Sequence, residues 1–177
     1  HCFLEPPAGV AFVDPDDVLT VMVCTQYPHY HHKQIARALG RPMEKVRVVQ
    51  TVVGGGFGGK MDNTVEIAIA FLALKAERPA RMVYSREEVF TSTTKRHPMK
   101  VKQKLGATKD GKFTAFDVEF LLDGGAYRSY SITVSGRCVI HAGMPYMFPN
   151  MRVDLKTAFT NHVPCGAMRS FGIVKTA

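Results

Sequence analysis

The residues best suited to chemistry lie in a glycine-rich segment, residues 54–60, with the sequence Gly-Gly-Gly-Phe-Gly-Gly-Lys. Glycine tolerates positive φ and has no Cβ to block a ligand, so the N–H groups of its five glycines can turn onto an anion or an oxo group. A β-branched run precedes the segment, and residues 63–74 read as a buried helix capped near Asp62 or Asn63. This order of strand, loop and helix favours anion binding. A flexible linker is the alternative.

The residue after the glycine-rich segment bears on whether the segment is a P-loop, which binds nucleotide phosphates, or another kind of anion-binding loop. Gly54 to Lys60 fits the P-loop pattern G-x-x-x-x-G-K, which requires a following Ser or Thr to ligate magnesium. The residue at that position is Met61, and a thioether is a poor ligand for a hard cation. A P-loop-like nucleotide-binding module is therefore the second interpretation. A non-catalytic binding or assembly domain is the third.

Composition sets the broad class of the protein. The chain has 177 residues, of which 46% are hydrophobic and 21% charged, as in a globular protein with one or two modest cores. Lys and Arg exceed Asp and Glu by 23 − 15 = 8, partly through residues 95–104, whose alternation predicts a strand with a basic outer face. We expect neither nucleic acid nor a membrane as partner. The abrupt start at His1 predicts a piece of a larger protein.

The cysteines and histidines do not form a metal-binding pattern. No C-x-x-C pair is present, so we expect the chain to carry no zinc site or iron–sulfur cluster of its own. Scattered cysteines are typical of a reducing, cytoplasmic location. The histidines lack an acidic companion at zinc-like spacing and are expected to be structural or on the surface. The residues concerned are Cys2, Cys24, Cys138, Cys165, His29, His31, His32 and His97.

The remaining sequence predicts an α+β fold with mixed sheets and packed helices. Pro28 and Gly40 bracket a helix, and the Asp110-Gly111 turn joins the two arms of the clearest hairpin. An internal boundary is expected near residues 78–95. The predicted strands are 11–13, 18–24, a strand from Val46, 80–84, 101–107, 113–122 and 151–158; the predicted helices are 28–39, 63–74, 86–90 and an irregular 131–141.

Taken in order, these segments resemble the molybdenum-binding region of the xanthine dehydrogenase and aldehyde oxidase family, the molybdenum hydroxylases. The pieces that match are Leu4-Glu5-Pro6, Thr25-Gln26 with residues 54–60, Arg96-His97-Pro98 through Gly125-Ala126-Tyr127, and Thr160-Asn161 with residues 167–172. The step of 31 residues from Gln26 to Phe57 is similar to the family's spacing. Each piece alone is weak, and the ordered set carries the resemblance.

The resemblance implies a role for each matching residue. The family holds molybdenum through the dithiolene of a pterin cofactor, so no side chain is expected to ligate the metal directly. Gln26 is implied to reach an oxo ligand, Phe57 to present its backbone N–H near the metal, and Arg169 to supply a similar loop contact. Gly55, Gly56 and Gly58 complete the cofactor-binding set. Arg137 and Phe171 are implied to face the substrate, with Arg128 as an alternative to Arg137.

The resemblance also implies what lies outside the chain. The family's general-base Glu follows the last motif, and the catalytic portion is several times longer than this chain. We therefore expect the remaining catalytic region as a partner, and iron–sulfur clusters and FAD on other domains or subunits. The implied cofactor is molybdenum–molybdopterin, with the cytosine dinucleotide as one of its forms. The isolated chain is expected to be inactive.

Three departures from the family pattern bear on the substrate. Met61 stands where purine-oxidising members carry a Glu, so it is counted among the substrate-facing positions. Ser170 replaces the usual Gly in Arg-Gly-Phe-Gly. The carbon monoxide dehydrogenase branch has a Cys just after the Arg, whereas Cys165 precedes Arg169 by four residues, which argues against that branch. The expected reaction is hydroxylation, with water as oxygen source, of an N-heteroaromatic (purine- or nicotinate-like) or aldehyde substrate.

Overall fold

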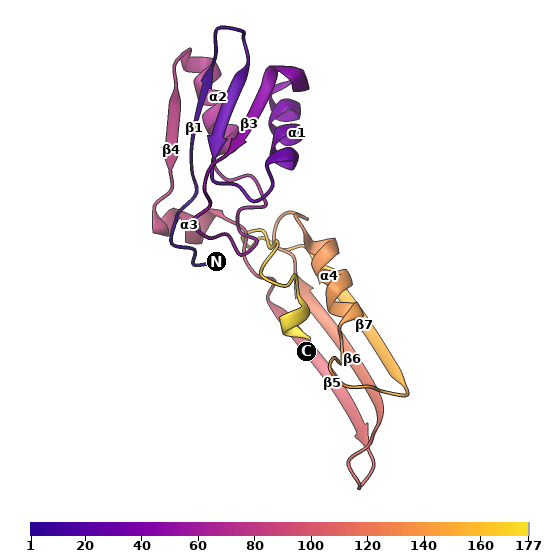
Figure 1. The fold of residues 1–177 in the computed structure, drawn as a ribbon. Helices are drawn as coiled ribbons and strands as arrows, with labels where there is room; N and C mark the ends of the chain where they lie inside the picture. Colours follow the sequence, from indigo (N-terminus) through magenta and orange to yellow (C-terminus); the bar gives the residue numbers. More distant parts are fainter. Residues whose placement is uncertain (177) are drawn as a thin grey trace. The chain divides into compact units, whose positions relative to one another are not determined.

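The computed structural model describes residues 1–176, which form two compact units, the first spanning His1–Thr93 and the second beginning at Thr94 (Figure 1). Both units combine a sheet with packed helices, so the predicted α+β class is confirmed. No helix within the described residues is long and apolar enough to cross a membrane.

The first unit is built on a four-stranded sheet in the order β3-β2-β1-β4. Strand β1 is antiparallel to β2 and β4, whereas β2 is parallel to β3. A parallel pair needs a crossover, and helix α1 provides it. The elements are β1 (Ala8–Val13), β2 (Leu19–Val23), α1 (Pro28–Leu39), η1 (Met43–Lys45), β3 (Val46–Gln50), α2 (Glu66–Ala76), β4 (Ala80–Val83) and α3 (Arg86–Ser92).

Helices α1 and α2 pack against each other and against the sheet, and so enclose the first core (Figure 1). Alternate residues of β2, such as Val21, are fully buried against Ile35 of α1 and Ile69 of α2. As predicted, α1 begins with a proline and ends at Gly40, whose φ is 63°. The predicted start of α2 is wrong: the helix begins at Glu66, without a side-chain cap.

The parallel pair determines where the functional residues lie. In the register of β2 and β3, Val23 is opposite Gln50, so both strands end at the same edge of the sheet. Gln50 donates from Nε2 to the carbonyl oxygen of Thr25 at 2.6 Å, which holds the two strand ends together. The segment that follows β2 therefore meets the glycine-rich segment that follows β3. The carboxyl ends of parallel strands are the usual place for ligands in such sheets.

The second unit is a three-stranded sheet in the order β5-β6-β7, with α4 on one face (Figure 1). The predicted hairpin is confirmed: β5 (Met99–Ala107) pairs antiparallel with β6 (Phe113–Asp123). Helix α4 (Ser131–Ile140) then crosses to β7 (Met151–Ala158), parallel to β6. The predicted irregular helix is a regular α-helix, and a short 3₁₀ helix, η2 (Ile173–Lys175), follows the last motif. Phe120 and Leu122 pack against Val134 and Cys138 in this core.

Candidate functional site

Gln26 lies just beyond β2 and is bonded to the glycine loop, residues 54–60, in three ways. Its backbone N–H donates to the carbonyl oxygen of Lys60 at 3.0 Å. Its side-chain Oε1 accepts from the backbone N–H groups of Gly58 at 3.0 Å and Lys60 at 3.2 Å. Two N–H donors fix the orientation of the amide, because only an oxygen can face both. The Nε2 of the exposed Gln26 has no partner in the described part of the protein and can donate to a ligand.

The loop itself offers fewer free N–H groups than its composition predicts. Those of Gly54, Gly58 and Gly59 are used internally, by Glu5 Oε2, Gln26 Oε1 and the carbonyl oxygen of Gly56. The expectation that all five glycines face an anion is therefore wrong for these three.

Three consecutive N–H groups stay without a partner within residues 1–176: those of Gly55, Gly56 and Phe57. Gly55 has a φ of 95°, Phe57 of 51° and Gly58 of 91°. Successive N–H groups in such turns form concavities for electronegative groups. Phe57 is 45% exposed. The loop thus fits the edge of an anionic or oxo-bearing cofactor.

The packing of Gly56 explains why that position has no side chain. A Cβ on Gly56 would lie 2.3 Å from Oε1 of Gln26, far inside van der Waals contact. Any larger residue must therefore displace either the loop or the Gln26 amide. The glycine is required for the Gln26 contacts as well as for the approach of a ligand.

A buried cation supports the loop from behind. Lys60 is 1% exposed, its Nζ lies 2.6 Å from Glu5 Oε2, and it also lies over the ring of Phe3. Burial acts to raise the pKa of Glu5, but hydrogen bonds from Lys60 and Gly54 and the charge of Lys60 outweigh it and lower that pKa. The segment before β1 is thereby fixed under the loop. The sequence marks Glu5 only as part of a motif and does not indicate its partner.

A second buried pair lies beside the same loop, and sequence reasoning missed it. His31 of α1 and Glu66 of α2 are both almost fully buried, with Nδ1 of His31 3.2 Å from Oε1 of Glu66. The same Nδ1 is 2.9 Å from Oγ1 of Thr25, and Nε2 is 2.9 Å from the carbonyl oxygen of Met61. Burial acts to lower the pKa of His31, but the hydrogen bond and charge of Glu66 outweigh it, and the pKa is raised.

In the second unit, the structure brings together the two residues predicted to face the substrate. Arg137 is carried by α4, and its guanidinium carbon lies 5.0 Å from the centre of the Phe171 ring. The ring of Tyr130 meets Phe171 edge-on at 6.2 Å. Cation and ring interact favourably at this distance. Arg128, the alternative to Arg137, lines a different hollow, beside Ile132 and Phe159.

The loop that carries Phe171 has an unusual backbone. Ser170, Phe171 and Gly172 have φ values of 70°, 51° and 101°. Ser170 thus adopts the left-handed conformation that a glycine would adopt more easily. A Cβ on Gly172 would lie 2.5 Å from Sγ of Cys138, so this glycine is required by packing against α4.

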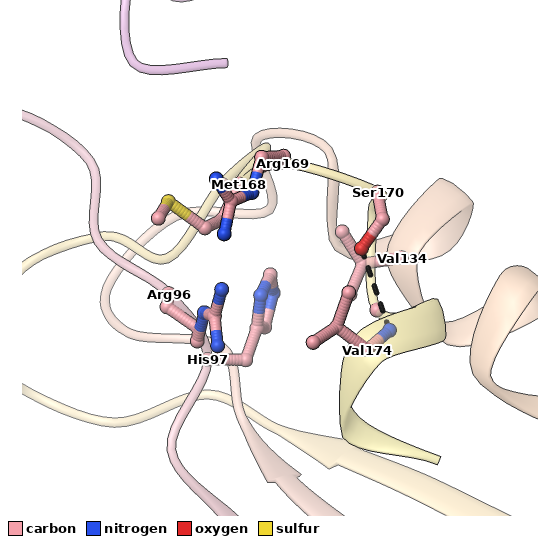
Figure 2. Close-up of a pocket in the computed structure, with 9 residues that line it drawn as sticks. Arg96, His97, Val134, Met168, Arg169, Ser170 and Val174 are labelled. Atoms are coloured by element: carbon pink, nitrogen blue, oxygen red, sulfur yellow. Dashed lines mark hydrogen bonds between the residues drawn. The ribbon is translucent and has the colours of Figure 1, made fainter. Parts of the chain in front are cut away.

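Arg169 lies at a small cavity that it shares with Arg96, His97 and Met168 (Figure 2). The cavity measures about 10 Å³, room for one water molecule, so it cannot hold a substrate. His97 is buried, with Nε2 2.8 Å from Oγ of Ser131, as expected for a structural histidine. Phe171 and Arg137 do not line this cavity.

Asp123, at the end of β6, organises the turn and loop near the last motif. Its carboxylate accepts from Thr160 Oγ1 at 2.6 Å and from the Gly125 N–H at 2.9 Å, and it lies 2.5 Å from Nδ1 of His162. The hydrogen bonds from Thr160, His162 and Gly125 lower the pKa of Asp123 to about 2. A Cβ on Gly125 would lie 2.4 Å from the carbonyl oxygen of Val163, so the turn and this loop are in close contact.

The predicted site residues form two sets, each within its own unit. Gln26 and the loop residues Gly55, Gly56, Phe57 and Gly58 meet in the first unit. Arg137 and Phe171 meet in the second, where Arg169 belongs to the same loop as Phe171. Met61 is half-buried, and its carbonyl oxygen is bonded to His31.

Comparisons with known proteins show which family the chain resembles. The chain is 47% identical over 173 residues to the nicotinate dehydrogenase large molybdopterin subunit of Eubacterium barkeri, covering 98% of this chain and 41% of that protein. It is 34% identical to the xanthine dehydrogenase molybdenum-binding subunit of Escherichia coli, covering 97% of this chain and 23% of that protein. The chain therefore spans less than half the length of these relatives.

Among solved structures, the aldehyde oxidoreductase of Desulfovibrio gigas superposes with a TM-score of 0.94 at 29% identity, covering 99% of this chain and 19% of that one. The family of the molybdopterin cofactor-binding domain matches residues 1–177. The P-loop alternative finds no support in these matches. The chain therefore belongs to the molybdopterin cofactor-binding domain family.

Proposed function

We propose that this chain forms part of a molybdenum hydroxylase and faces the metal end of its pterin cofactor with Gln26 and the glycine loop. The observation that carries the proposal is the fixed amide of Gln26, whose Oε1 is occupied by Gly58 and Lys60 and whose Nε2 is left to donate outward. When bound, the cofactor supplies a two-electron oxidation in which water is the source of the oxygen added to the substrate. The role of the protein is to orient the cofactor and to polarise the groups at its metal end.

Each residue of the loop has a distinct task in this proposal. Gln26 and the N–H of Phe57 donate hydrogen bonds to the cofactor, and the N–H groups of Gly55 and Gly56 extend the row of donors. Gly58 holds Gln26 in place. Within the second unit, Arg169 lies on the loop that carries Phe171 and is assigned a cofactor contact by the resemblance of that loop's sequence to the family. Donors fixed before the reaction need no reorganisation during it, which is the source of their catalytic value.

For the substrate we propose an N-heteroaromatic compound rather than a simple aldehyde. The Phe171 ring offers an aromatic face, and Arg137 places a cation close to it. A cation stabilises negative charge that develops on a heteroaromatic ring during oxidation. Met61 stands at the sequence position where purine-oxidising members carry a Glu, so a carboxylate that would favour a purine is missing there. The names of the relatives support this class, since nicotinate and xanthine are both N-heteroaromatic, whereas the solved relative is named an aldehyde oxidoreductase.

The complete enzyme needs parts beyond this chain. We propose that the remaining catalytic region supplies the general-base Glu and encloses the cofactor, in its pterin or cytosine dinucleotide form. Iron–sulfur clusters and FAD on other domains or subunits would accept the electrons. The 177-residue chain alone is then expected to be inactive, because it lacks the base and most of the enclosure.

The proposal is tested with Gln26→Ala in the full-length enzyme. A donor that acts on the cofactor contributes to turnover and not to substrate affinity, so kcat per bound molybdenum should fall about 10²-fold while KM stays within about threefold. Gln103→Ala is the matched control, since Gln103 is an exposed glutamine on β5. Unchanged kcat in Gln26→Ala with full molybdenum would reject the role given to Gln26.

A further inference from the structure

The buried pair of His31 and Glu66 is not used by the proposed function. The side chain of His31 is 0% exposed and that of Glu66 is 2% exposed. Glu66 Oε2 also accepts from the N–H of Thr64. Every polar atom of this pair therefore contacts another part of the protein. Stability alone does not explain such a pair, because well-packed apolar residues of similar volume are often as stable as a buried ion pair.

The hydrogen bonds determine which atoms of His31 carry protons. The carbonyl oxygen of Met61 can only accept, so Nε2 of His31 carries a hydrogen. Nδ1 faces the carboxylate of Glu66, which also only accepts when ionised. The geometry at both ring nitrogens and the raised pKa of His31 both favour the imidazolium form. His31 and Glu66 thus form an ion pair inside the first unit.

The contacts of His31 and Glu66 reach two segments: the end of β2 that carries Gln26, and the end of the glycine loop that bonds to Gln26. Nδ1 of His31 meets Oγ1 of Thr25, the residue directly before Gln26. The same Oγ1 donates to the carbonyl oxygen of Lys60 at 3.3 Å, and Nε2 of His31 holds Met61, the next residue. Lys60 is in turn one of the two donors to Gln26 Oε1. One imidazolium therefore holds the strand end that carries Gln26 and the end of the loop that orients it.

We propose that His31 and Glu66 are positioning residues for the cofactor-facing amide of Gln26. Glu66, at the start of α2, fixes the charge and direction of the His31 ring. The ring then fixes Thr25 and Met61 relative to each other, so that Gln26 Oε1 meets Gly58 and Lys60. An apolar pair would fill the core equally well, but it would not fix the positions of Thr25 and Met61 relative to each other. The catalytic meaning of the inference rests on the proposed function; the structural part does not.

The test measures hydrogen exchange at the loop in the full-length protein before cofactor insertion. The amides of Gly58 and Lys60 are protected by Gln26 Oε1, so their exchange reports whether that contact persists. The double variant His31→Leu, Glu66→Leu keeps the side-chain volume in the core approximately unchanged and removes the directional hydrogen bonds of the pair. We expect exchange of these amides to accelerate at least tenfold, while core amides of β1 accelerate less than threefold, so that the change is local to the loop. After cofactor insertion, kcat per molybdenum should fall at least tenfold with KM within threefold.

Two further variants keep the test decisive. Ile69→Val, on the inner face of α2, removes one methylene from the core without touching a hydrogen bond, and its exchange and kcat should stay within twofold of the wild type. If the double variant does not fold, Glu66→Gln is compared with Glu66→Leu at about pH 8.5, where the lost counter-charge of His31 costs least. Gln keeps an oxygen for His31, so its exchange should stay within threefold, whereas that of Glu66→Leu should rise tenfold.

The outcomes separate this inference from the proposed function. Wild-type exchange in the double variant, or equal exchange in Glu66→Gln and Glu66→Leu, would overturn the positioning role. Accelerated exchange in the cofactor-free double variant would support it. Loss of kcat in the double variant supports the catalytic part, and unchanged kcat would overturn that part. A Gln26→Ala enzyme with wild-type kcat would instead reject the proposed function and leave the exchange result standing.

Discussion

Arg137 and Phe171 are 34 positions apart in the sequence, yet the guanidinium carbon lies 5.0 Å from the centre of the aromatic ring. Helix α4 supplies the cation, and the loop after Ala167 supplies the ring. The pair places a positive charge over an aromatic ring, at a distance at which the two attract each other. This contact is the structural basis for the proposed substrate class.

Replacing Arg137 should therefore affect heteroaromatic substrates most. In Arg137→Gln, kcat/KM for nicotinate or hypoxanthine is expected to fall about 10²-fold, because the charge that stabilises the reacting ring is lost. For benzaldehyde the loss should be less than tenfold. Steady-state kinetics of the full-length enzyme measure both. Arg128→Gln is the matched control and should change neither; the selective loss in Arg128→Gln instead would move the role to Arg128.

The ion pair of His31 and Glu66 should make stability depend on pH. The pKa of folded His31 is raised above its ordinary value of 6.5, and Glu66 and Asp62 are the negative groups that raise it. The pair therefore stabilises the fold fully below pH 6.5, and this contribution declines as the pH rises through the higher folded pKa. Glu66→Gln should lower the free energy of unfolding at about pH 5.5 by more than at about pH 8.5.

Urea unfolding of wild type and Glu66→Gln across this range measures the difference. Glu66→Leu, which leaves the imidazolium without a counter-charge, should lose about 3–5 kcal/mol at about pH 5.5. A difference between wild type and Glu66→Gln that does not vary with pH would show that His31 is neutral in the folded protein.

Asp123 should give stability the opposite pH dependence to that of His31: its contribution is present at high pH and lost at low pH. Its pKa is lowered to about 2, so its ionised form stabilises the fold above the ordinary pKa of 3.8, and this contribution is lost as the pH falls through about 2. Asp123→Asn should destabilise the protein by roughly 1–2 kcal/mol at about pH 7, through weaker bonds to Thr160 and His162. The difference in denaturation midpoint between wild type and Asp123→Asn should be smaller at about pH 2.5 than at about pH 7. An equal difference at the two pH values would contradict this prediction.

Much of the fold could be predicted from local signals. Pro28 and Gly40 bracket α1, and the Asp110-Gly111 turn lies between two alternating runs, so α1 and the hairpin of β5 and β6 follow from short-range chemistry. The start of α2 at Glu66 could not be predicted, because Asp62 and Asn63 look like caps and only tertiary packing decides that neither caps the helix.

The site was predicted less completely than the fold. The motif order indicated that Gln26 and the glycine loop belong together, and the parallel strands β2 and β3 explain why they meet. Which N–H groups stay free could not be predicted, because Gly54 is bonded to Glu5, 49 positions away, and Gly58 to Gln26, 32 positions away. The ion pair of His31 and Glu66 joins two helices and leaves no local signal.

The central claim is that the glycine loop and Gln26 hold the cofactor, and molybdenum content tests it most directly. Gly56→Val would place a Cβ 2.3 Å from Oε1 of Gln26, whereas a Cβ on Gly136, in α4, meets nothing within 4 Å. Both variants, Gly56→Val and Gly136→Ala, are made in the full-length enzyme, purified from a host that makes the cofactor, and assayed for molybdenum per protein, with circular dichroism to confirm folding. We predict less than a tenth of the wild-type molybdenum in Gly56→Val and the full amount in Gly136→Ala. Full molybdenum in a folded Gly56→Val enzyme would contradict the claim.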